Sequence, residues 1–148
     1  MKESNKSTWE RINKMASILI VDDSSATRIK LRNLLEPHHH ECLDAGNGLE
    51  ALDKLKTNKV DLIICDLNMP EMDGIEFITR QSQDETINGI PTIMCTTETI
   101  NKKSEAGMVL YQKVKSTGVV KAWIVKPVTP KKASLIIDFL NKLTKEKS

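Results

Sequence analysis

The chain has 148 residues, about the length of one domain, and its 28% charged and 39% hydrophobic residues are typical of globular proteins. No stretch approaches the roughly 20 apolar residues of a membrane-spanning helix, and the N-terminal residues lack the apolar middle of a signal peptide. Twenty-two basic and twenty acidic residues leave a net charge of +2. This balance argues against a nucleic-acid-binding protein, which usually has a concentrated basic face. We expect a cytoplasmic protein that binds neither nucleic acid nor membrane.

Short apolar runs rich in β-branched residues predict the strands of a sheet. In chain order they lie at residues 17–21, 60–65, 91–95 and 122–125, with a weaker candidate at 41–45. Their hydrophobicity is continuous rather than alternating. This pattern is typical of strands covered on both faces, as in a parallel sheet.

Helical patterns lie between these runs. Ser24 or Ser25 caps a first helix that Pro37 ends, and further helices are predicted at 48–57, 74–83, 100–116 and from Pro130 onward. Gly118 is the stop signal of the fourth helix. Five strands alternating with five helices predict a doubly wound α/β fold, a five-stranded parallel sheet with helices on both faces.

The cysteines and histidines do not predict a metal site or a disulfide framework. Cys42, Cys65 and Cys95 contain no CxxC pair, and we expect buried free thiols. The histidines at 38–40 are consecutive, so they cannot all face one point, and we expect them in a solvated loop after Pro37.

Polar residues follow the strands at their carboxyl ends, where doubly wound proteins bind ligands. They are Asp22 and Asp23 after the first strand, Asp66 after the third, Thr96 or Thr97 after the fourth, and Lys126 after the fifth. Three carboxylates this close repel one another unless a cation lies among them, and oxygen ligands with an open face favour Mg²⁺. A carboxylate beside a metal ion and a lysine suits phosphoryl transfer that forms an aspartyl phosphate.

The motifs IVDDS (20–24), DLNMPEMDG (66–74), TTE (96–98) and WIVKP (123–127) resemble the receiver domain of bacterial response regulators. The residues of the last two motifs, TTE and WIVKP, are most similar to those of the stand-alone, CheY-like chemotaxis branch. The resemblance extends over about residues 16–143 in the correct order. It implies a flavodoxin-like fold with strand order 2-1-3-4-5.

The resemblance also implies a role for each matching residue. Asp66 accepts phosphate from a histidine kinase, and Mg²⁺ is held by Asp22, Asp23, Asp66 and the backbone carbonyl of Asn68, with Asp23 the more direct ligand than Asp22. Lys126 pairs with the phosphoryl group, and Thr96 hydrogen-bonds it. The protein would catalyse only its own phosphorylation and dephosphorylation.

Other implied residues concern signalling. Trp123 holds the place of an aromatic side chain that changes rotamer as the threonine moves, although plain core packing is the alternative. Pro127 follows a cis peptide in the family. Asn68 and Glu98 border the path of the attacking water, which implies a short-lived phosphate. The output face binds a partner such as a flagellar switch protein, and we expect a monomer.

The sequence departs from the family pattern in two places. Residues 1–15 precede the expected receiver domain, 16–145, as an N-terminal extension. Thr96 and Lys126 are more widely separated than is usual, which predicts that the fourth helix is longer by about two turns. Residues 99–121 carry five lysines against Glu105, so the partner is expected to present an acidic patch or to differ from the usual flagellar switch.

Three other functions remain open. A phosphorelay intermediate would pass its phosphate to a second histidine protein, and a pseudo-receiver would act as a constitutive interaction module. The complete set of Asp22, Asp23, Asp66, Thr96 and Lys126 argues against the pseudo-receiver. A nucleotide or flavin binder ranks low because the first strand ends in acids rather than in a Gly-rich turn.

Overall fold

The computed structural model describes residues 16–38 and 40–146. Its sheet has five parallel strands in the order β2-β1-β3-β4-β5, which confirms the predicted doubly wound fold and its 2-1-3-4-5 order. The strands are β1 (Ser17–Val21), β2 (Glu41–Ala45), β3 (Leu62–Cys65), β4 (Thr92–Thr96) and β5 (Val120–Val125). The helices are α2 (Ser25–Leu35), α3 (Gly48–Leu55), α4 (Gly74–Ser82), α5 (Glu105–Thr117) and α6 (Pro130–Glu146).

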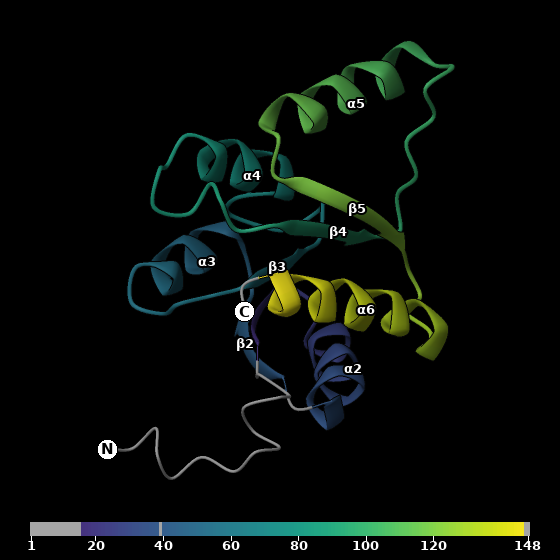
Figure 1. Cartoon of the computed structure of the whole chain (residues 1–148). Helices are drawn as coiled ribbons and strands as arrows, with labels where there is room; N and C mark the ends of the chain where they lie inside the picture. The colour runs from purple at the N-terminus through teal and green to yellow at the C-terminus, as the bar shows by residue number, and fades with distance from the viewer. Residues whose placement is uncertain (1–15, 39, 147–148) are drawn as a thin grey trace, which may run out of the picture.

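Helices cover both faces of the sheet (Figure 1). Ile18 and Ile20 of β1 pack with residues of α2 and α6 on one face, while Leu19 and Val21 pack on the face that α3, α4 and α5 cover. Because successive side chains of a strand point to opposite faces, a strand between two helical layers must be apolar throughout. This explains the continuous apolar runs in the sequence.

Side-chain caps set where the helices begin. Ser24, Asn47, Asp73 and Ser104 each accept a hydrogen bond from the backbone N–H three residues on. Each cap satisfies one of the N–H groups that the first turn of a helix leaves free. Of the two predicted caps of the first helix the structure uses Ser24, and the predicted starts at Gly48 and Gly74 are confirmed. A 3₁₀ turn (Glu36–His38) follows α2.

The fourth helix differs from its prediction. It is α5, which has 13 residues and begins at Glu105 rather than near Ile100, so the expected extension by about two turns is wrong. Residues 97–104 form the long connection from β4 seen in Figure 1. Within it the Asn101 side chain accepts from the N–H of Lys103 at 3.0 Å, and Ser104 donates to the Asn101 carbonyl. Such local bonds favour a turn over a helix.

The histidine prediction is correct only in part. His38 is exposed, but His40 is buried, and its Nδ1 lies 3.4 Å from the N–H of Ala16. His40 directly precedes the edge strand β2, which begins at Glu41 and pairs with β1, so its side chain is covered rather than solvated. His39 and the extension 1–15 lie outside the described residues.

Two further predictions can be compared with the structure. Cys42, Cys65 and Cys95 are buried free thiols, as expected. Over residues 16–38 and 40–146, no helix is long and apolar enough to cross a membrane.

Candidate functional site

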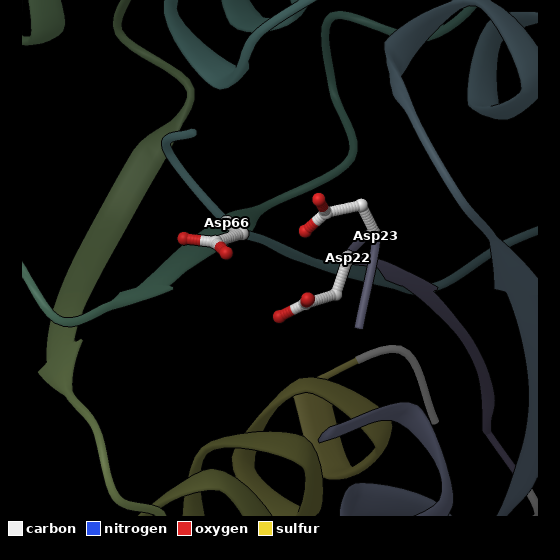
Figure 2. A group of neighbouring side chains, drawn as sticks. All are labelled: Asp22, Asp23 and Asp66. Carbon is white, nitrogen blue, oxygen red and sulfur yellow. The ribbon is translucent and has the colours of Figure 1, made fainter. Parts of the chain in front are cut away.

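Three aspartates meet at the carboxyl edge of the sheet, where β1 and β3 end side by side. Val21 is in register with Cys65, so the next residues, Asp22 and Asp66, are neighbours. The N–H of Asp66 donates to the Val21 carbonyl at 2.9 Å. Each of Asp22, Asp23 and Asp66 offers a carboxylate oxygen within 4.8 Å of the others, and Figure 2 shows their side chains around one space.

The three carboxylates differ in burial. Asp22 is 2% exposed and Asp66 is 8% exposed, whereas Asp23 is exposed. Burial raises the pKa of Asp22 above its ordinary value, and hydrogen bonds from Lys126 and Ser24 offset this only in part. Among the described residues these three form the single acidic group with the spacing of a metal site. The donor set therefore fits a hard divalent cation.

Lys126 supplies the positive charge within the cluster. Its Nζ lies 2.8 Å from Asp22 Oδ2 and 3.0 Å from Asp66 Oδ2, and its side chain is 16% exposed. Burial lowers the pKa of Lys126, but the hydrogen bonds to both aspartates outweigh this effect, so the pKa is raised overall. The Lys126–Pro127 peptide is cis, as the resemblance implied.

Thr96 is the last residue of β4 and is completely buried, whereas Thr97 is exposed. The carbonyl of Thr96 accepts from the N–H of Lys126 at 2.8 Å, so the ends of β4 and β5 are joined beside the cluster. Thr96 Oγ1 lies 3.4 Å from the N–H of Glu98. Of the two threonines considered from the sequence, Thr96 is thus the one joined to the cluster.

Trp123 contacts the connection that follows Thr96. Its indole Nε1 donates to the carbonyl of Glu98 at 2.8 Å, and its ring is half-buried against the core. Plain core packing therefore does not describe Trp123 fully. The side chains of Glu98 and Asn68 are exposed near the ends of β4 and β3.

Sequence reasoning missed two residues that shape the cluster. A Cβ on Gly74 would lie 2.2 Å from the carbonyl oxygen of Asp66, so only glycine fits there. Arg28 donates from Nη1 to the carbonyl of Asp22 at 2.6 Å. The glycine that closes the DLNMPEMDG motif could have signalled the close approach, but an arginine six residues beyond Asp22 carries no such signal.

Known proteins are similar to most of this chain. Residues 18–134 match the family described as the response regulator receiver domain. A chemotaxis protein CheY homolog of Campylobacter jejuni is 38% identical over 115 residues, which cover 76% of this chain and 82% of that protein. The structure of CheY4 of Vibrio cholerae is 33% identical, with a TM-score of 0.72 over 87% of this chain and 98% of that one.

A third similar structure was solved with an ion complex. The response regulator TrrA of Thermotoga maritima, in complex with Mg²⁺ and BeF, is 26% identical, with a TM-score of 0.67 over 87% of this chain and 99% of that one. Together these matches cover most of the described sheet and helices. The chain belongs to the response regulator receiver domain family and is homologous to the CheY chemotaxis proteins.

Proposed function

We propose that this protein is a stand-alone response regulator that a histidine kinase phosphorylates on Asp66 in a Mg²⁺-dependent reaction. The phosphorylated form signals in the cytoplasm through a protein interaction, in chemotaxis, and residues 16–145 form the receiver unit. The carrying observation is the joint contact of Lys126 with Asp66 and Asp22, at 3.0 and 2.8 Å, beside the exposed Asp23. This arrangement brings together a carboxylate that can act as nucleophile, the ammonium of Lys126 and a metal-binding face.

The metal ligands of this proposal are the carboxylates of Asp22, Asp23 and Asp66 and the backbone carbonyl of Asn68. Support comes from the donor set, since oxygen ligands on one open side suit Mg²⁺. TrrA, a structural neighbour, was solved with Mg²⁺ and BeF. A bound Mg²⁺ would neutralise charge on the phosphoryl oxygens.

The remaining residues perform the transfer. A carboxylate oxygen of Asp66 forms a bond to phosphorus as the bond between phosphorus and the kinase histidine breaks, and the electron pair leaves with the histidine nitrogen. Lys126 moves from the carboxylate pair to a phosphoryl oxygen. The hydroxyl of Thr96 donates a hydrogen bond to another oxygen of the phosphoryl group. Because Lys126 is largely buried, its charge is little screened by water.

The signal leaves through Glu98 and Trp123. If the hydroxyl of Thr96 turns to the phosphoryl group, it releases the N–H of Glu98, whose carbonyl holds the Trp123 indole. The change reaches the surface of α5, β5 and α6, which we assign as the output face. A hollow of about 470 Å³ beside Trp123 is lined by Tyr111 and by lysines at 102, 115 and 121, which suits an acidic partner such as a flagellar switch protein.

The phosphate of this proposal is short-lived, and the protein is a monomer. The exposed side chains of Asn68 and Glu98 leave the cluster open to an attacking water and can orient it. A phosphorylated sample mixed with Mg²⁺ should lose its phosphate without added enzyme. A phosphate that persists for hours would contradict this part of the proposal.

Intact-protein mass spectrometry tests the central claim. Wild type, incubated with acetyl phosphate and Mg²⁺, should gain the mass of one phosphoryl group, while Asp66→Ala and samples with a chelator should gain none. Asp53→Asn changes an exposed aspartate of α3 and serves as the control that still reacts. A wild type that stays unmodified and fails to bind beryllofluoride would support the pseudo-receiver function instead.

A further inference from the structure

We propose that Arg28 of α2 is a positioning residue for the metal ligands Asp22 and Asp23. This inference rests on the proposed Mg²⁺ site. Arg28 Nη1 donates to the backbone carbonyl of Asp22 at 2.6 Å, and its Nε lies 3.7 Å from Asp44 Oδ2 on β2. The guanidinium thus joins the turn after β1 to the edge strand of the sheet.

The contacts of Asp22 explain why this bond matters. Its N–H donates to the Ala45 carbonyl at 2.9 Å, its Oδ1 accepts from the N–H of Ser24, and its Oδ2 pairs with Lys126. The carbonyl is its remaining polar group, and Arg28 holds it. The peptide between Asp22 and Asp23 is therefore fixed in orientation, and with it the direction in which the exposed Asp23 side chain leaves the backbone (Figure 2).

The geometry of Arg28 also argues against a role limited to its ion pair. Asp44 is already paired with Arg32, whose Nη2 lies 2.6 Å from Oδ1. Within the described part of the chain, Arg28 Nε is a buried donor without a hydrogen-bond partner. A buried donor without a partner costs free energy. The guanidinium is thus placed to reach the Asp22 carbonyl rather than to complete its pairing with Asp44.

Charge and positioning predict opposite effects on metal binding. A guanidinium near a cation site repels the cation, so charge alone predicts that removal of Arg28 tightens Mg²⁺ binding. Positioning predicts weaker binding, because groups that hold metal ligands in place typically contribute about 10–100-fold in affinity. The sign of the change in Mg²⁺ affinity therefore separates the two explanations.

The test is isothermal titration of the full chain with Mg²⁺, with urea unfolding measured in parallel. We expect Arg28→Gln to weaken Mg²⁺ binding about tenfold. Arg32→Gln is the matched control, because it breaks contacts with Asp44, Glu36 and the Cys42 carbonyl but does not touch Asp22. We expect its Mg²⁺ affinity to stay within about twofold of wild type while its stability falls, because the contacts of Arg32 include none of Asp22, Asp23 and Asp66, although it shares Asp44 with Arg28.

Three results would overturn the inference. They are an unchanged or tighter affinity in Arg28→Gln, an equal loss in Arg32→Gln, and no Mg²⁺ binding by wild type, which would overturn the proposed metal site as well. If Arg28→Gln does not unfold cooperatively, Arg28→Lys decides. Lysine keeps the positive charge but lacks the guanidinium Nη1 that reaches the Asp22 carbonyl, so Arg28→Lys should bind Mg²⁺ more weakly than wild type. Wild-type affinity in this variant would refute the positioning role of the guanidinium.

Discussion

Removal of the Lys126 ammonium should destabilise the metal-free protein far more than removal of the charge of Asp22, one of the two aspartates that it contacts. In Lys126→Met the carboxylates of Asp22 and Asp66, whose side chains taken alone are 3% and 10% exposed, lose the ammonium between them. Removing one partner of a buried pair costs about 3–5 kcal/mol. Because Lys126 is itself 16% exposed, we expect the lower end, about 3 kcal/mol at pH 7.5.

The pKa shifts of Asp22 and Lys126 determine which of the two substitutions lowers the free energy of unfolding. Burial raises the pKa of Asp22 in the folded state, so its ionised form lowers stability once the pH exceeds the ordinary carboxyl range, near about 4. Lys126 has a raised pKa despite its burial, so its stabilising contribution is present at neutral pH and is lost only in strong alkali. Asp22→Asn should therefore match or exceed wild type in metal-free stability at pH 7.5.

Urea unfolding followed by circular dichroism, in buffer with a chelator, measures these differences. The difference in free energy of unfolding between wild type and Lys126→Met should be largest near pH 7.5 and should shrink as the carboxylates become protonated toward pH 4. Mg²⁺ should also narrow it, since a divalent cation replaces the missing charge. The reasoning is refuted if Asp22→Asn is as unstable as Lys126→Met at pH 7.5, or if the gap is unchanged at low pH.

Three further predictions concern the backbone and the thiols. Glu71 has a φ of 64°, a left-handed conformation that strains a residue with a Cβ. Glu71→Gly should therefore raise the free energy of unfolding by about 1 kcal/mol, and an unchanged urea midpoint would contradict the presence of this strain. Gly118 ends α5 with a φ of 72°, and Gly118→Ala should cost about 1 kcal/mol, whereas Gly89→Ala, in open space without such a φ, should be nearly neutral in the same assay. Burial raises the pKa of Cys42 to about 12 and of Cys95 to about 11, so the native thiols should react slowly with a disulfide reagent at pH 8 and rapidly in urea.

The sequence predicted the elements whose signals are local. Continuous apolar runs marked the central strands because two helical layers cover them, and Ser24 marked the start of α2 because its side chain bonds to the first turn of that helix. Strand ends then located the acidic cluster. Asp22 and Asp66 are adjacent since parallel strands bring their carboxyl ends to one edge.

Features that depend on partners distant in the sequence were not predicted. His40 is buried because β2 pairs with β1, which brings it to Ala16, a residue 24 positions earlier in the sequence. Arg28 bonds a backbone carbonyl, which every residue offers, so no motif points to it. The start of α5 was misplaced because the apolar spacing of residues 100–116 suits a helix, while the hydrogen bonds of Asn101 and Ser104 favour a turn.

The misplaced start of α5 changes how a signal can travel. A longer helix would have begun close to Thr96 and would have moved as a rigid body. The structure instead has a non-helical connection at 97–104, in which the backbone N–H of Glu98 bonds to Thr96 and the backbone carbonyl of Glu98 bonds to Trp123. Under the proposed function, a shift of the Thr96 hydroxyl therefore reaches the output face through the backbone of this single residue. The relay contacts Trp123 of β5 directly, whereas the one buried residue of α5 is Val114, which is outside the relay.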